Sequence, residues 1–218
     1  MRSVVVLGEG ELVIRVAEWF RSTDGYELRA IVPVMPEPDW APSFIAWAKA
    51  NNIKVVESGH YKDVLALLNI LCLDLIVSVA YNKILPEWFI RKCARTLNIH
   101  GGPLPQYRGV SPINWALKNG EKEYGVTIHE ISPKIDSGPI VAQAKFSIYP
   151  ELDEVIDVIH RVDAYAWLLF QHTMPLLDHI KAQPQDESLA RYYSKKDRAL
   201  LQERAYLTRQ EYFDATTK

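Results

Sequence analysis

The stretch Leu73-Asp74-Leu75-Ile76-Val77-Ser78-Val79 is the most convincing central strand of this chain. Its apolar residues follow one another almost without interruption, which is typical of a strand buried on both faces of a parallel sheet. Strand-like and helix-like patterns alternate on either side of it. They predict an α/β fold with a mixed, mostly parallel twisted sheet and helices on both faces. We expect further strands at residues 4–7, 28–34, 54–56, 126–131 and 140–148, and helices at residues 12–20, 43–51, 62–70 and 151–170.

A second strand ends in polar residues, at Leu97-Asn98-Ile99-His100. Alternate residues of a strand share a face, so we expect the side chains of Asn98 and His100 to point the same way. Gly101 and Gly102 then allow the backbone to turn and leave room for a close approach. An amide and an imidazole beside such a turn suit acyl transfer, because Asn98 can donate to a developing oxyanion while His100 stabilises the same oxygen or moves protons.

Asp136 lies in a later loop, and its carboxylate could fix the imidazole tautomer or receive the proton of an attacking amine. A plainer interpretation fits the same residues. A strand that ends in Asn-x-His before Gly-Gly is often only a polar terminus that leads into a turn, and an aspartate in a loop often caps that loop. The residue types alone leave the catalytic and the structural interpretation equally open.

Several short sequence motifs between about Leu73 and Gln143 help to decide between the catalytic and the structural interpretation. They are Asn-Ile-His-Gly from residue 98, Leu-Pro-Gln-Tyr-Arg-Gly from 104, Ser-Pro-Ile-Asn-Trp-Ala from 111, Tyr-Gly-Val-Thr-Ile-His from 124 and Ile-Asp-Ser-Gly-Pro-Ile from 135. In this order they resemble the formyltransferase family, which uses 10-formyltetrahydrofolate as its formyl donor. The resemblance implies a Rossmann-like topology, a catalytic trio of Asn98, His100 and Asp136, and chemistry that requires no metal.

The resemblance also implies the positions of the two small-molecule sites. For the folate donor it implies Tyr81, Asn82, Lys83, Ile84, Leu85 and Gly138. For the acceptor we expect Gly101, Gly102, Pro103, Tyr107 and Arg108. Methionyl-tRNA formyltransferases usually have glycine where Asn82 stands, whereas the sugar-modifying branch more often has a polar residue there. Lys83 is then a candidate for a diphosphate contact, although most single exposed lysines are simply solvated.

The resemblance leaves several acceptors open. We favour a nucleotide-linked amino sugar, since the chain is expected to lack the C-terminal domain with which methionyl-tRNA formyltransferases hold tRNA. Glycinamide ribonucleotide is the second candidate. A formyltetrahydrofolate hydrolase and a folate- or nucleotide-binding module without turnover are the remaining alternatives.

The composition bears on the partners of the chain, on membrane segments and on the state of its cysteines. The chain has 218 residues and a formal net charge of −2, which gives no electrostatic case for a nucleic-acid partner. We expect no membrane segment, because no apolar run is long enough to cross a bilayer. Cys72 and Cys93 lack metal-ligand spacing, so we interpret them as reduced thiols of a cytoplasmic protein.

We divide the chain into a catalytic domain at residues 1–182 and a helical or irregular extension at residues 183–218. The extension includes an expected helix at 200–213, and its apolar residues predict a homodimer. Within the catalytic domain we expect Ser111 to cap a helix that begins at Pro112, and we interpret His129 as a half-buried structural histidine. The expected apolar face of the helix at 151–170 consists of Val155, Ile159, Val162, Ala166 and Leu169.

Overall fold

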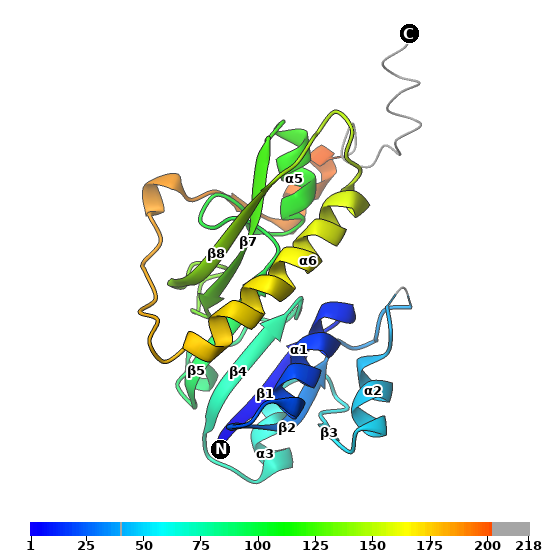
Figure 1. Ribbon diagram of the computed structural model, residues 1–218, viewed down its shortest axis with the longest axis vertical. Helices are drawn as coiled ribbons and strands as arrows, with labels where there is room; N and C mark the ends of the chain where they lie inside the picture. The colour runs from blue at the N-terminus through cyan, green and yellow to red at the C-terminus, as the bar shows by residue number, and fades with distance from the viewer. Residues whose placement is uncertain (40, 202–218) are drawn as a thin grey trace. The chain divides into compact units, whose positions relative to one another are not determined.

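The computed structural model describes residues 1–39 and 41–201 (Figure 1). Contacts group the chain into two compact units. Unit 1 comprises residues 1–99 and 129–134, and unit 2 comprises residues 100–128 and the chain from residue 135 onward. The strands of the main sheet follow the order β3-β2-β1-β4-β5-β7-β8. The predicted mixed, mostly parallel sheet is therefore confirmed.

The sheet of unit 1 is parallel. Its strands are β1 (Arg2–Gly8), β2 (Tyr26–Pro33), β3 (Lys54–Val55), β4 (Leu73–Val79) and β5 (Cys93–His100). Strand β1 pairs in parallel with both β2 and β4, and β4 pairs in parallel with β5. Their carboxyl ends consequently lie at one edge of the sheet, which is where open α/β folds bind ligands.

The helices of unit 1 are short. They are α1 (Glu11–Ser22), α2 (Phe44–Ala50), the 3₁₀ turn η1 (Tyr61–Asp63), α3 (Val64–Leu68) and α4 (Glu87–Ile90). The single helix expected over residues 62–70 is thus a 3₁₀ turn followed by an α-helix. It ends early because Asn69, with φ of +52°, adopts the left-handed conformation that terminates helices.

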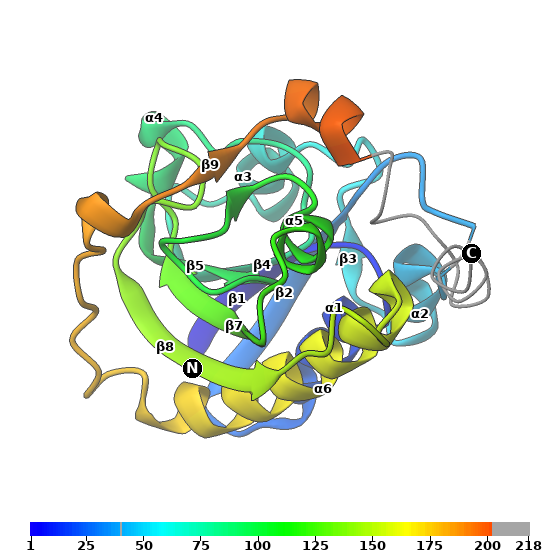
Figure 2. The same ribbon diagram turned by 90° about the horizontal axis from the view of Figure 1, so that it is seen from above.

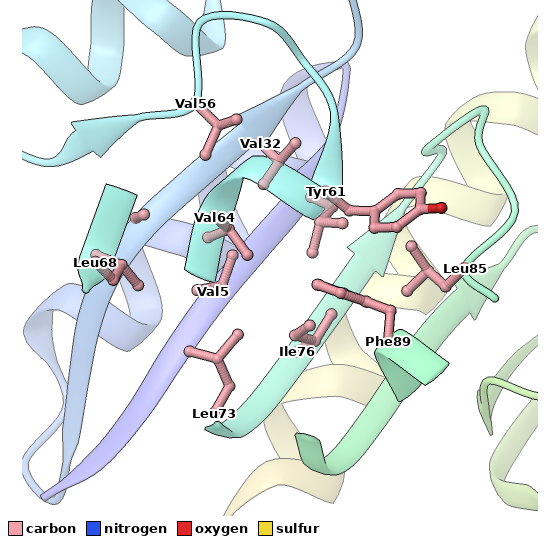
Figure 3. Close-up of a cluster of buried hydrophobic side chains, with 12 residues drawn as sticks. Val5, Val32, Val56, Tyr61, Val64, Leu68, Leu73, Ile76, Leu85 and Phe89 are labelled. Atoms are coloured by element: carbon pink, nitrogen blue, oxygen red, sulfur yellow. The ribbon is translucent and has the colours of Figure 1, made fainter. Parts of the chain in front are cut away.

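Apolar side chains cover both faces of this sheet. On one face Val5 and Leu7 of β1 pack in a cluster with Val64 and Leu68 of α3 (Figure 3). Residues between them on β1 point to the other face, where α1 contacts β1, β2 and β4. Figure 2 shows α1 and α3 on opposite sides of these strands, as predicted.

Unit 2 contains α5 (Pro112–Lys118), most of β7 (Glu123–Glu130), β8 (Ile140–Ser147) and α6 (Val155–Thr173). Short elements complete it: β6 (Arg108–Gly109), η2 (Met174–Leu176), η3 (Glu187–Leu189), β9 (Tyr192–Tyr193) and η4 (Lys195–Leu201). Strands β6 and β9 form a separate parallel pair. The C-terminal segment up to residue 201 therefore belongs to unit 2 by its contacts.

The predicted start and the predicted apolar face of the helix at residues 151–170 were wrong. Helix α6 begins at Val155, because Glu154 and Asp157 form a capping box. Its buried residues are Val158, Val162, Ala166, Phe170 and Thr173, whereas the predicted Ile159 is 36% exposed. The helix carries apolar residues on more than one face, so its periodicity fits two alternative faces.

Ser111 precedes α5 as expected, but its side chain does not cap the helix. With φ of +56° it is left-handed, and its Oγ accepts a hydrogen bond of 3.1 Å from Arg198 Nε. A side chain in this conformation cannot reach the first-turn amides in the usual N-cap geometry.

The division at residue 182 and the homodimer stay predictions. The helix expected at residues 200–213 lies outside the described residues beyond Leu201, which ends η4. In the part of the chain that the structure describes, no helix has the length and apolarity needed to cross a membrane.

Replacing Gly8 with alanine should destabilise the protein strongly. A Cβ at Gly8 would lie 1.7 Å from the carbonyl oxygen of Val79, and Gly8 has φ of +143°. We expect Gly8→Ala to lower the free energy of unfolding by about 3 kcal/mol, from the clash and the backbone strain together. Urea denaturation measures the change.

Gly25→Ala is the matched control. Gly25 also has positive φ, +88°, but a Cβ at Gly25 would have no neighbouring atom within 4 Å. Its substitution should cost only about 1 kcal/mol. Equal losses of stability in the two variants would show that a Cβ at position 8 does not clash with the Val79 carbonyl.

Candidate active site

His100 is held at the last position of β5 by a backbone carbonyl. Its side chain is 8% exposed, and Nε2 lies 2.7 Å from the carbonyl oxygen of Tyr107. A carbonyl can only accept, so Nε2 carries the hydrogen and Nδ1 is the nitrogen whose protonation can change. Nδ1 faces the carboxylate of Asp136, with 3.7 Å between Nδ1 and Oδ2.

Gly102 makes room for this arrangement of the imidazole. A Cβ at Gly102 would lie 3.0 Å from His100 Nε2 and 3.2 Å from the carbonyl oxygen of Tyr107. The turn itself is tied to β7, since Tyr124 donates to the Gly101 carbonyl at 2.7 Å and Thr127 donates to the Gly102 carbonyl at 2.8 Å. The predicted acceptor-site glycines therefore shape the surroundings of His100.

Asp136 is fixed by the same loop that holds His100. Its Oδ2 accepts a hydrogen bond of 2.9 Å from the backbone N–H of Gly109. The side chain is 13% exposed, and the residue is left-handed with φ of +49°. The structure thus brings His100 and Asp136 together within unit 2, at a distance that allows an ion pair when the imidazole is protonated.

Tyr107 and Arg108, both predicted at the acceptor site, have partners within unit 2. The Tyr107 hydroxyl donates to Glu121 at 2.6 Å, and its ring stacks on Tyr193 with 5.7 Å between centroids. Burial, followed by the hydrogen bond to Glu121, raises the pKa of Tyr107. Arg108 is bound by Gln185 and Glu187, and its side chain is 9% exposed. Their roles toward an acceptor stay predictions.

Asn98 lies in unit 1, two residues before His100 on β5. Its Nδ2 lies 3.2 Å from Nε2 of His129, whose Nδ1 donates to the carbonyl of Glu130 at 2.8 Å. His129 therefore presents an unprotonated Nε2 that accepts one of the two amide hydrogens of Asn98. The sequence predicted a half-buried histidine here, whereas His129 is buried, at 2% exposed. Its contact with Asn98 has no local signal, since the two residues are 31 positions apart.

The residues predicted at the donor site lie in the loop after β4. The Tyr81 hydroxyl donates to the Gly59 carbonyl at 2.9 Å, and Lys83 Nζ donates to the same oxygen at 2.8 Å. Leu85 belongs to the buried cluster of Figure 3, whereas Ile84 is 60% exposed. Asn82 is exposed. This loop is thus anchored by the side chains of Tyr81 and Lys83, and the exposed residues in it include Asn82 and Ile84.

The remaining predicted residues lie in unit 2. Gly138 is buried, and its carbonyl accepts a hydrogen bond from Gln185 at 2.7 Å. The carbonyl of Pro103 accepts from the Tyr107 N–H at 3.1 Å. Among the described residues no group of three or more His, Cys, Asp and Glu side chains could hold a metal ion.

A parallel α/β sheet with an imidazole and a carboxylate paired next to the end of a central strand is typical of enzymes that transform small molecules. A family model described as formyl transferase matches residues 42–169. This match covers more than half of the chain, and the chain therefore belongs to the formyltransferase family.

One relative of known name is also a formyltransferase. A methionyl-tRNA formyltransferase from Lactobacillus acidophilus is 33% identical over 200 residues, which make up 85% of this chain and 62% of that protein. This chain thus spans less than two thirds of that relative's length.

Two solved structures are similar in fold. One is an N-formyltransferase from Helicobacter canadensis in complex with folinic acid and dTDP-3-aminofucose, with a TM-score of 0.76 and 23% identity over 90% of this chain and 72% of that chain. The other is a sugar 3N-formyltransferase with dTDP and 5-N-formyl-THF, with a TM-score of 0.78 and 25% identity over 90% of this chain and 71% of that chain.

Raising the pH above about 10 should destabilise the fold through Tyr81. Burial raises the pKa of Tyr81 from 10.0 to about 12. Between these values the unfolded chain loses a proton that the folded chain keeps, so the free energy of unfolding falls as pH rises. The slope should stay below about 1.4 kcal/mol per pH unit, since the hydroxyl is only partly buried.

Urea denaturation at pH 9, 10 and 11 measures this loss in the wild type and in Tyr81→Phe. The variant lacks the titrating hydroxyl and should lose less stability over this range. The same loss in both proteins would show that Tyr81 does not contribute.

Proposed function

We propose that this chain transfers a formyl group from 10-formyltetrahydrofolate to the primary amine of a nucleotide-linked amino sugar. The observation that carries the transfer chemistry is the His100–Asp136 pair, with 3.7 Å between Nδ1 and Oδ2, held by one loop within unit 2. Membership in the formyltransferase family supports the donor.

In the proposed reaction the unprotonated amine attacks the formyl carbon. A carbon–nitrogen bond forms to the acceptor, the bond from the carbon to N10 of the donor breaks, and a proton passes from the amine to the leaving nitrogen. The tetrahedral intermediate carries a negative oxygen, which a donor such as Asn98 or protonated His100 can stabilise. Asp136 stabilises the imidazolium and serves as a route for the amine proton.

Asn98 fits the role of oxyanion donor by its place on β5. Strand periodicity gives its side chain the same face as that of His100. One of its two amide hydrogens is directed to His129, which restricts rotation of the amide and leaves a second donor for the oxyanion. A donor fixed before the reaction stabilises developing charge without the cost of reorientation.

The choice of a nucleotide sugar rests on the residues and on the structural neighbours. Asn82 is polar, as in the sugar-modifying branch, and Lys83 next to it is a cation for a diphosphate. The two fold neighbours were solved with a dTDP-sugar or with dTDP, each beside a folate. The net charge of −2 gives this chain no overall attraction for tRNA.

The comparison adds methionyl-tRNA as a candidate acceptor ahead of glycinamide ribonucleotide, because the relative that is 33% identical is a methionyl-tRNA formyltransferase. Glycinamide ribonucleotide, hydrolysis of the donor and folate binding without turnover remain as further alternatives. We also propose that the protein acts as a cytoplasmic homodimer, which sedimentation at several concentrations tests.

An acceptor screen separates these functions. Purified protein is incubated with 10-formyltetrahydrofolate and, separately, a dTDP- or GDP-linked amino sugar, glycinamide ribonucleotide or methionyl-tRNA. We expect mass spectrometry to find one added formyl group on an amino sugar. Formylation only of glycinamide ribonucleotide or of methionyl-tRNA would overturn the sugar assignment. Donor breakdown without an acceptor would indicate a hydrolase, and donor binding without any turnover a binding module.

Substitution of the proposed catalytic residues should slow the chemical step. Asn98→Ala, His100→Asn and Asp136→Asn should each lower kcat by about a hundredfold or more, since each removes charge stabilisation in the transition state. Glu123→Gln is the control, because Glu123 pairs with Lys145 on the exposed side of β7 and β8, at 2.7 Å. Steady-state kinetics with the acceptor found in the screen decide the outcome. Activity close to wild type in Asp136→Asn would remove this carboxylate from the mechanism.

A further inference from the structure

The side chain of Gln185 connects three segments of unit 2. Its Nε2 donates to the carbonyl of Asp136 at 2.9 Å and to the carbonyl of Gly138 at 2.7 Å. Its Oε1 accepts from Nε of Arg108 at 3.0 Å and from Nη2 at 2.8 Å. Both amide hydrogens and both lone pairs of the oxygen are therefore used. The orientation of the amide is unambiguous, since a rotated group would place N–H donors against a guanidinium.

The two carbonyls that Gln185 binds belong to Asp136 and Gly138, the residues on either side of Ser137. Asp136 also carries the carboxylate of the candidate site. Asp136 has φ of +49°, a conformation that L-residues adopt rarely and that persists only where the surroundings enforce it. The neighbouring bonds between the backbones of Ile140 and Gln183, at 2.7 and 2.8 Å, attach the same loop to the C-terminal segment. Together these contacts enforce the backbone conformation at Asp136.

The side-chain oxygen of Gln185 binds Arg108, in the loop that contacts both His100 and Asp136. Arg108 belongs to β6, and its neighbours on either side bind the candidate catalytic residues: the Tyr107 carbonyl accepts from His100, and the Gly109 N–H donates to Asp136. Gln185 thus connects the backbone that carries Asp136 to the side chain of Arg108, and the backbone next to Arg108 binds the Asp136 carboxylate.

We propose that Gln185 is a positioning residue, which sets the position of the Asp136 carboxylate relative to the His100 imidazole. The expected effect of Gln185 on kcat rests on the proposed function. Its expected effect on the position of Asp136 rests only on contacts within unit 2. It assigns a part of the site to the C-terminal segment, which the sequence suggested only as a dimer element.

The variant Gln185→Glu tests the N–H donors of the side chain separately from its oxygen acceptor. Glutamate keeps an oxygen for Arg108 but has no hydrogen to donate, so it should repel the carbonyls of Asp136 and Gly138. Glu187→Gln is the matched control, because the carboxylate of Glu187 binds Arg108 from the same segment, at 2.7 and 3.1 Å. Gln185→Met serves as a second variant that keeps the volume and removes both kinds of bond.

The first readout does not depend on any activity. Amide hydrogen exchange by NMR reports on Gly109, whose N–H is bonded to the Asp136 carboxylate. We expect Gln185→Glu and Gln185→Met to accelerate exchange at Gly109 at least about tenfold, while amides in the middle of β7 and β8 keep their wild-type rates. Glu187→Gln should leave Gly109 unchanged. Wild-type exchange at Gly109 in both Gln185 variants, or failure of both variants to fold, would overturn the positioning role.

The second readout is kinetic. With the acceptor identified in the screen, the Gln185 variants should show kcat lowered by about 10- to 100-fold, and KM for donor and acceptor within about twofold of wild type. A rise in KM alone would contradict the proposal, because it would assign Gln185 to binding. If the wild type transfers no formyl group, the proposed function is lost, and the exchange at Gly109 still decides whether Gln185 positions Asp136.

Discussion

One short piece of backbone, residues 107–109, binds both titratable side chains of the candidate site within unit 2. The carbonyl of Tyr107 accepts from His100, and two residues later the N–H of Gly109 donates to Asp136. A carbonyl and an amide so close along one strand are held in a narrow range of relative positions by covalent geometry. The relative position of imidazole and carboxylate therefore depends on this segment more than on the rotamers of the two side chains.

The segment itself is held in place by the C-terminal part of the chain. Strand β9 pairs with β6, and the carbonyl of Tyr193 approaches Gly109 so closely that a Cβ there would lie 2.1 Å from it. The ring of Tyr193 stacks with both Tyr107 and Trp115, at centroid distances of 5.7 and 4.6 Å. Aromatic stacking and strand pairing restrict the loop together, so residues 192–193 contribute to the geometry of the site through the backbone that they hold.

The fold was largely predictable from the sequence, whereas only part of the site was. Strand β4 has the predicted bounds because the apolar run of a strand buried on both faces depends on no distant partner. The place of Asn98 and His100 two residues apart on one strand was predictable for a similar reason, since the two-residue period of a strand is a local property. Asp136 was one candidate carboxylate among the loop residues, and only the resemblance to a family favoured it over a loop-capping aspartate; its contact with Gln185 spans 49 residues. The charge of Arg108 suggested a ligand contact, but a buried cation needs partners, and the sequence does not say which distant residues supply them.

The hydrogen bond from His100 to Tyr107 also determines which nitrogen of the imidazole can take part in chemistry. With Nε2 committed to a carbonyl, the proton that is gained or lost during a reaction resides on Nδ1, the nitrogen that faces Asp136. Under the proposed function, a reacting oxygen or amine would approach Nδ1 at the edge of the ring that faces Asp136. The 3.7 Å between Nδ1 and Oδ2 allows an ion pair when the imidazole is protonated. Loop residues 107–109 thus hold both groups and determine which nitrogen of the imidazole faces Asp136.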